Sequence, residues 1–264
     1  MKLGIVSGVY CNYSLNEAVA HIAAAGYDCI DVWGGRPHVY RRDFSPQQLR
    51  QLRKQIEEAG LTVASFLPAF HRYPYSLSSP VGAIRRDSLQ YMRECMDNAA
   101  ELGAQILLIV PLQGIYQGSI EEGRERLIDS INAICEEAVP YPFKLGLEVV
   151  NPTASNLVNT ATEAVQIISR LDDQSVGIVL DTGHINLVDE SAEEAIRRAG
   201  DRLLQVHVND NDGRQQQNLI PGDGTFDFVG FINALRAAGY EGCLSAELGR
   251  QYALDPDPAV SLTI

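Results

Sequence analysis

Four side chains that can bind a metal ion stand at the ends of four apolar segments in the second half of the chain. They are Glu148, Asp181, His207 and Glu247, in the segments KLGLEVV, VGIVLD, LLQVHVN and CLSAEL. A carboxylate or imidazole at the end of a buried strand is costly unless its charge or polarity is compensated, and a shared divalent cation provides that compensation. Three carboxylates and one imidazole form a mostly oxygen set, which suits Mn²⁺ or Mg²⁺ and also accepts Co²⁺ or Zn²⁺. The sequence therefore predicts one divalent metal ion, with Mn²⁺ favoured, and open positions for water or substrate.

Each of these residues alone has a simpler structural explanation. A single glutamate at a strand end is usually solvated or paired with an arginine, and a single histidine in an apolar segment is more often a hydrogen-bonded core residue. Four such residues at the same end of consecutive strands favour a shared site instead. His184 lies three residues after Asp181, and this position beside a predicted ligand favours contact with substrate.

The elements that must position these residues are strands alternating with helices along the whole chain, a pattern typical of parallel βα units. We expect strands at Leu3–Ser7, Cys29–Trp33, Thr62–Leu67, Gln105–Val110, Lys144–Val150, Gly177–Asp181, Leu204–Asn209 and Cys243–Glu247. Glycines follow several of the helical patterns, at Gly26, Gly60, Gly103, Gly200 and Gly239. A helix that ends in glycine before a short link to a strand is what repeated αβ loops require.

Eight βα units predict an α/β fold, a (β/α)8 TIM barrel that forms a single domain over residues 1–264. A doubly wound open sheet is the alternative, but no GxGxxG motif follows the first strand. Residues 248–264 include Pro256 and Pro258, so the eighth helix is expected to be truncated. Apolar surface over strands 8 and 1 would then be available to a partner subunit, which predicts a homo-oligomer, either a dimer or a tetramer.

The charge of the chain excludes some classes of partner. The formal net charge is −13 and the isoelectric point is near 4.8, whereas a nucleic acid or an anionic membrane surface requires a dense basic footprint. No apolar run reaches the roughly 20 residues that cross a bilayer, and the start of the chain enters a strand pattern without a signal-peptide pattern. We therefore expect a cytoplasmic protein that binds neither nucleic acid nor membrane.

Four longer segments carry a resemblance to a known family. LGLEVVNP, VGIVLDTGHINL, LLQVHVNDND and IPGDGTFDF resemble the xylose isomerase-like barrels of the sugar isomerase and epimerase superfamily, whose ligands follow the same order of Glu, Asp, His and Glu. The segments VWGGRPH, YPY, DNDG and PGDG, at residues 32–38, 73–75, 210–213 and 221–224, are most similar to fructoselysine (fructosamine) 3-epimerases. The D-tagatose and D-psicose 3-epimerases are more distant.

The resemblance implies a reaction and a division of labour. Glu148 and Glu247 would ligate the metal and also act as acid and base on opposite faces of a ketose, inverting the carbon next to its carbonyl through a cis-enediolate without an organic cofactor. Asp181 and His207 would act mainly as ligands. The residues implied to contact the small-molecule sugar substrate are His184, Trp33, Arg36, His38 and Arg214.

Several other functions remain open. The same metal site suits an aldose–ketose or hydroxypyruvate-type isomerase, or an inosose dehydratase-like lyase. An abasic-site endonuclease has less support, because it needs a histidine cluster for several zinc ions and the fourth strand ends in Val110-Pro111-Leu112, although His71 follows the third. A binding module without catalysis has little support, because the full set of ligands and bases is present. No cluster of lysine or arginine marks a phosphate pocket, which favours an unphosphorylated or amine-linked substrate.

Overall fold

Eight parallel strands close into a barrel in the order of the sequence, with β8 pairing to β1. The computed structural model describes residues 1–70 and 74–263, so His71 and Tyr73 lie outside the described residues. The strands are β1 Lys2–Val6, β2 Cys29–Gly34, β3 Thr62–Pro68, β4 Ile106–Ile109, β5 Lys144–Glu148, β6 Gly177–Asp181, β7 Leu203–Val208 and β8 Cys243–Ala246. Each predicted strand is found with ends shifted by two residues or fewer. The predicted (β/α)8 barrel is therefore confirmed.

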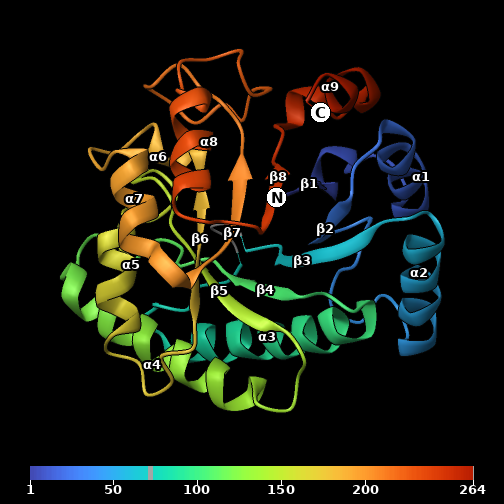
Figure 1. Ribbon diagram of the computed structural model, residues 1–264. Coiled ribbons are helices and arrows are strands. Elements are labelled where there is room, and N and C mark those ends of the chain that lie inside the picture. The colour runs from blue at the N-terminus through green and yellow to red at the C-terminus, as the bar shows by residue number, and fades with distance from the viewer. Residues whose placement is uncertain (71–73, 264) are drawn as a thin grey trace.

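Helices surround the barrel (Figure 1). They are α1 Leu15–Ala25, α2 Pro46–Glu58, α3 Gly82–Leu102, α4 Ile120–Ala138, α5 Ala161–Ile168, α6 Thr182–Ile185, α7 Ala192–Ala199, α8 Phe228–Ala237 and α9 Pro256–Leu262, with short 3₁₀ turns η1 Ser7–Tyr10, η2 Gly200–Arg202 and η3 Arg250–Tyr252. The side chains of Leu49, Leu52 and Ile56, three or four residues apart, form the buried face of α2.

The helix ends follow the local sequence. Ser45 caps α2: its side chain accepts from the backbone N–H of Gln48, whose own side chain accepts from the backbone N–H of Ser45, and Pro46 occupies the first turn. All five glycines expected to end helices have positive φ angles, from 51° at Gly200 to 95° at Gly26. Residues with a side chain rarely adopt this backbone conformation, so glycine allows the chain to leave each helix and enter the next strand.

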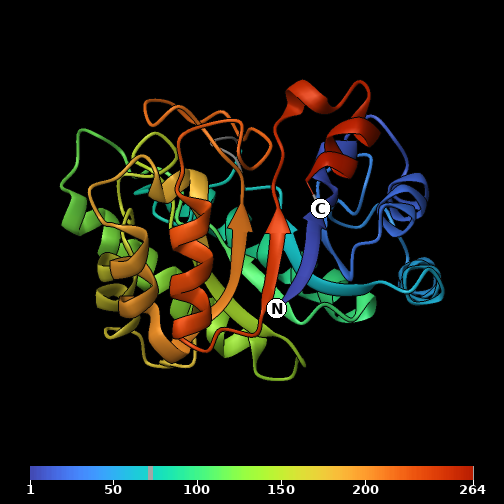
Figure 2. The same cartoon turned by 45° about the horizontal axis from the view of Figure 1, so that its top comes forward.

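The helix after β8 is short, as predicted. It is α9, with seven residues, and the hydroxyl of Tyr27 donates to the carbonyl of Val260 to hold it against the barrel. Figure 2 shows β8 and β1 side by side with α8 on one side of them. An apolar groove lies over these strands and β7, and its lining includes Leu3, Tyr27, Val208, Phe228, Ile232 and Leu244. The apolar surface expected beside the truncated helix is therefore present.

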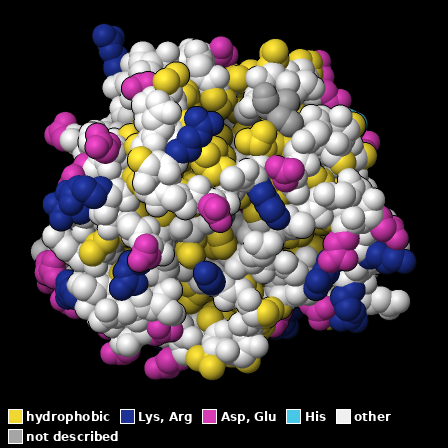
Figure 3. Space-filling view, in the orientation of Figure 1, with side chains coloured by type: hydrophobic (Ala, Val, Ile, Leu, Met, Phe, Trp, Pro, Cys, Tyr) yellow, Lys and Arg dark blue, Asp and Glu magenta, His cyan; other side chains and the backbone are white. Residues whose placement is uncertain are grey.

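One face of the molecule mixes charges of both signs. On the face in Figure 3, acidic and basic side chains are interspersed, without a broad basic area. This distribution is consistent with the net charge of −13 and differs from the basic footprint of proteins that bind nucleic acid. Within residues 1–70 and 74–263, no helix combines the length and the apolar character that crossing a membrane requires.

Candidate metal centre

The four predicted ligands converge at the carboxyl end of the barrel. One potential ligand atom from each of Glu148, Asp181, His207 and Glu247 lies within 4.8 Å of the others. Glu148 and Asp181 are the last residues of β5 and β6, and Asp181 is the register partner of His207 in β7. Glu247 follows β8, and its N–H donates to the carbonyl of Val208, which continues the strand pairing. The sheet register therefore brings together four residues spread over 100 positions of sequence.

Asp181 is fixed by two hydrogen bonds. Its Oδ1 accepts from the backbone N–H of His184 at 2.8 Å, and its Oδ2 accepts from Nδ2 of Asn209 at 2.7 Å. The pKa of Asp181 is raised to about 6, mainly by burial and also by the charges of Glu247 and Glu148, while His184 and His207 oppose the shift. Burial disfavours the charged form of Asp181, and a cation nearby would stabilise that form.

His207 directs one ring nitrogen at both glutamates. Its Nδ1 lies 3.0 Å from Oε1 of Glu148 and 3.2 Å from Oε2 of Glu247. Burial alone lowers the pKa of His207, but hydrogen bonds to Glu148 and Glu247, and their charges, raise it well above its usual value. One imidazolium cannot balance three carboxylates at this separation. The donor set thus fits a divalent cation, which the three carboxylates and Nδ1 would hold.

A cavity of about 280 Å³ opens above these ligands, close to the lower end of the roughly 300–1,000 Å³ typical of small-molecule sites. Glu148 and Glu247 both line it, whereas Asp181 and His207 lie beneath. Its apolar walls include Val6, Trp33, Leu67, Phe70, Val110, Val150 and Leu248. Among the described residues, its other polar side chains are His184, Gln216, Asn218 and Arg250. A small polar molecule entering this cavity would meet both glutamates.

His184 lines the cavity with a defined hydrogen-bonding direction. Its Nδ1 lies 2.8 Å from Nδ2 of Asn151. The orientation of the Asn151 amide is fixed, because its Oδ1 accepts from the backbone N–H groups of Thr153 and Ala154. Nδ1 of His184 must therefore accept from Asn151, so in a neutral ring the hydrogen sits on Nε2. His184 can thus donate from Nε2 to an oxygen of a bound molecule.

The other residues expected near substrate are placed differently. Trp33 lines the cavity, and His38 packs behind it with ring centroids 5.9 Å apart and only 1% of its surface exposed. Arg36 pairs with Asp43 instead of facing the cavity. Arg214 is exposed in the loop after β7 and is not among the residues that line the cavity.

Asp210 supports the site although no sequence pattern above predicts it. Asp210 is fully buried and accepts five backbone N–H bonds, from Asn211, Gly222, Gly224, Thr225 and Phe226. It thereby shapes the loop that carries Gln216 and Asn218. A signal was present, because a buried strand that ends in HVND and is followed by PGDG places an acidic side chain near a glycine-rich turn.

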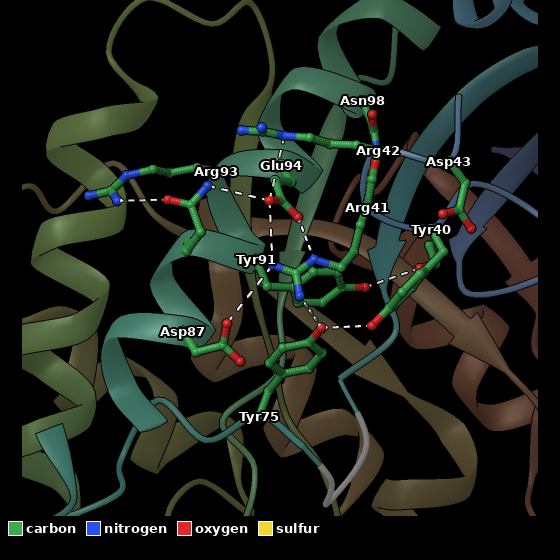
Figure 4. A network of polar contacts seen from close by, with 12 residues as sticks. Tyr40, Arg41, Arg42, Asp43, Tyr75, Asp87, Tyr91, Arg93, Glu94 and Asn98 are labelled. Atoms are coloured by element: carbon green, nitrogen blue, oxygen red, sulfur yellow. Dashed lines mark hydrogen bonds and ion pairs between the residues drawn. The ribbon is translucent and has the colours of Figure 1, made fainter. Parts of the chain in front are cut away.

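Two loops beside the cavity are held by α3 (Figure 4). The hydroxyl of Tyr91 donates to the carbonyl of Gly34 and accepts from the N–H of Ala69, which joins the ends of β2 and β3. The ring of Tyr91 stacks on Tyr75 with centroids 4.2 Å apart. Glu94 of α3 pairs with Arg41 at 2.6 Å. This network positions the segments at the ends of β2 and β3 that contain Trp33 and Phe70, which line the cavity.

Comparison with known proteins gives relatives with the same barrel. A fructoselysine 3-epimerase of Escherichia coli O157:H7 is 26% identical over 256 residues, which span 97% of this chain and 93% of that protein. A D-psicose 3-epimerase of Agrobacterium fabrum is 26% identical over 255 residues, 91% of this chain and 83% of that protein. Both relatives are named as sugar 3-epimerases, which are isomerases.

Solved structures agree in fold. A crystal structure of D-psicose 3-epimerase in the presence of D-fructose matches 97% of this chain and 89% of its own, with a TM-score of 0.80 and 24% identity. The crystal structure of IOLI protein with a binding zinc atom matches 100% and 95%, with a TM-score of 0.84 and 22% identity. The sequence model of the xylose isomerase-like TIM barrel family matches residues 19–261. The chain therefore belongs to the xylose isomerase-like TIM barrel family.

Proposed function

We propose that this protein is a divalent-metal-dependent 3-epimerase of a ketose or ketose derivative. The observation that carries the proposal is the pair of glutamates: Glu148 and Glu247 both line the cavity and both contact Nδ1 of His207. Two carboxylates at one cation site can serve two faces of the same small substrate. The names of the relatives support a 3-epimerase among the reactions that such a site allows.

The proposed reaction moves one proton off a carbon and another onto its opposite face. One of Glu148 and Glu247 accepts the proton from the carbon next to the carbonyl, and the other donates a proton from the other side. The two residues stand on β5 and after β8, with β6 and β7 between them. Nε2–H of His184 orients a substrate oxygen, and Trp33 provides an apolar wall.

The metal ion would be held by the two glutamates together with Asp181 and His207. When bound, it supplies a Lewis acid that stabilises negative charge on substrate oxygens. Because three of the four donors are carboxylates, we propose Mn²⁺, with Mg²⁺, Co²⁺ or Zn²⁺ as functional substitutes. Asp181 is fixed by His184 and Asn209, which leaves proton transfer to the two glutamates.

The test is product analysis with purified protein and Mn²⁺. Candidate ketoses, including fructoselysine, are incubated and followed by NMR. A product inverted at the carbon next to the carbonyl supports the proposal. An aldose product would indicate an aldose–ketose isomerase instead, and an unsaturated product that absorbs ultraviolet light would indicate a lyase. No conversion of any candidate would contradict the proposal.

The substrate we favour is unphosphorylated or amine-linked. Arg250 is the one arginine or lysine among the described residues that line the cavity, whereas phosphate sites usually combine several donors and cations. Comparing kcat/KM for a ketose, its phosphate and its lysine adduct tests this preference. A clear preference for the phosphate would contradict it.

Assembly and location remain predictions. The apolar groove over β7, β8 and β1 supports a homo-oligomer, because a second subunit would remove Leu3, which is 40% exposed, and the partly exposed Phe228 from water. Light scattering at micromolar concentration tests this expectation, and a monomer would contradict it. The expected cytoplasmic location can be checked by fractionating the source cells.

A further inference from the structure

One ring nitrogen of His207 has no hydrogen-bond partner although it is fully buried. Nδ1 faces Glu148 and Glu247. On the other side of the ring, Nε2 makes no hydrogen bond to any described residue. A buried N–H without an acceptor costs about 1–3 kcal/mol. We therefore expect Nε2 of His207 to have a hydrogen-bond acceptor in the functional state.

The acidic group nearest to that nitrogen is Asp31 on β2. Its Oδ2 lies 3.9 Å from Nε2 of His207, and both side chains are fully buried. A hydrogen bond between nitrogen and oxygen measures about 2.7–3.2 Å. A shift of roughly 1 Å by the ring and the carboxylate would therefore form the bond. This gap is too narrow for a bridging water, so the two groups face each other directly.

Asp31 is held in place from two sides. Oγ of Ser65 donates to its Oδ1, and Nε2 of Gln205 donates to its Oδ2, each at 2.8 Å. The register of β2 with β3 shifts between Ile30 and Asp31, and the register of β6 with β7 shifts next to Gln205. Such bulges redirect side chains, and here they direct Asp31 and Gln205 to the same point inside the barrel.

The contacts of Asp31 leave room for another donor. An ionised carboxylate has about four acceptor sites; the bonds from Ser65 and Gln205 use two of them, and the hydroxyl of Ser245 is a further neutral donor, which leaves a site free. All of these donors are neutral, so they do not compensate a buried negative charge, which is costly in a barrel interior. A positively charged histidine–metal unit beside Asp31 would compensate it. This carboxylate therefore suits the ligand histidine better than a purely structural role.

We propose that Asp31 is a positioning residue for His207. It accepts a hydrogen bond from Nε2–H, which keeps the hydrogen off Nδ1 and fixes the ring with Nδ1 directed at the metal ion. Partners of this kind set the tautomer and basicity of ligand histidines. The inference rests on the proposed metal site and adds a residue that does not touch the metal or the substrate.

The first experiment compares Asp31→Asn with a matched control. Mn²⁺ affinity is measured by titration calorimetry or electron paramagnetic resonance, and the thermal stability of the metal-free protein is measured alongside. Asp31→Asn should weaken Mn²⁺ binding about 10- to 100-fold with little loss of metal-free stability. Glu94→Gln neutralises another buried carboxylate, in the network with Arg41, and should lower stability while leaving Mn²⁺ affinity unchanged (Figure 4).

The second experiment uses the wild-type protein alone and decides the matter even if Asp31→Asn does not fold. With ¹⁵N-labelled histidine and diamagnetic Zn²⁺, NMR should show a hydrogen on Nε2 of His207 and none on Nδ1. Because ligation through Nδ1 places the hydrogen on Nε2 in any case, the deciding signal is a downfield, slowly exchanging Nε2–H, which a hydrogen bond to the Asp31 carboxylate produces; an Nε2–H without that shift would overturn the proposal. A hydrogen-free Nε2 would overturn the proposal. So would normal Mn²⁺ binding by Asp31→Asn together with reduced stability. Wild-type protein that binds no divalent metal would overturn the proposed function and this role together.

Discussion

Adding one methyl group at Gly183 should disrupt the metal site through Asn209. A Cβ at position 183 would lie 1.9 Å from Oδ1 of Asn209 and 2.9 Å from its Cγ. A carbon–oxygen contact needs about 3.3 Å, so the amide must move by roughly 1.4 Å. Asn209 is 1% exposed and its Nδ2 donates to Asp181. It cannot move this far without breaking that hydrogen bond.

The magnitude follows from three terms. Losing a hydrogen bond to a charged group costs about 1.5–3 kcal/mol, and inserting a methyl group into a packed site costs about 1–3 kcal/mol. Alanine gains up to about 1 kcal/mol over glycine inside a helix such as α6. Gly183→Ala should therefore destabilise the protein by about 1.5–6 kcal/mol, which lowers Tm by roughly 3–24 °C at about 2–4 °C per kcal/mol. Mn²⁺ affinity should fall as well, because Asp181 loses its support.

The assay is differential scanning calorimetry on single and double variants. Gly82→Ala at the start of α3 is the control, since its Cβ would meet only the end of the Arg86 side chain at 3.3 Å. Asn209→Ala removes the obstructing amide, so Gly183→Ala should cost much less in that background, with a coupling of about 0.5–3 kcal/mol. Additive effects of the two substitutions would refute the reasoning.

Three further predictions concern His38, Asn151 and the metal. Burial lowers the pKa of His38 from 6.5 to about 4. As pH falls below 6.5, the unfolded chain therefore binds a proton at His38 while the folded protein does not. Wild type should lose about 3 kcal/mol of stability from this group between pH 7 and 4; if urea denaturation shows the same pH dependence in His38→Gln, the prediction is wrong. Asn151→Ala should free Nδ1 of His184 and lower kcat/KM about tenfold or more without changing Mn²⁺ affinity, and an unchanged kcat/KM would count against this role. Chelation should abolish turnover and lower Tm, with both restored by Mn²⁺; full activity after complete chelation would contradict the metal site.

The parts of the fold and site that the sequence predicts are those with local signals. Glu148, Asp181 and His207 each follow a run of apolar residues suited to a buried strand, so their shared position at one barrel end follows from strand order alone. Helix ends at Gly26 and Gly60 are equally local, because a positive φ angle is a property of one residue.

The parts that the sequence does not predict depend on register and loop paths. Asp31 sits inside an apolar strand, and the bulge that turns it toward His207 leaves no mark in the sequence. His38 and Arg36 follow β2 closely, yet the loop directs His38 behind Trp33 and Arg36 toward Asp43. Side-chain direction in a loop depends on tertiary contacts, here those of His38 with Ser7 and of Arg36 with Asp43, and not on spacing.

The most direct test of the two-glutamate mechanism is solvent deuterium at the inverted carbon. Wild type, Glu148→Gln and Glu247→Gln are incubated with the ketose substrate in D₂O at saturating Mn²⁺, and the product is examined by NMR. The mechanism predicts one deuterium at the inverted carbon with wild type, and a loss of turnover of about 10²- to 10⁴-fold in each variant. Inversion without deuterium, or near-wild-type turnover in either variant, would contradict it.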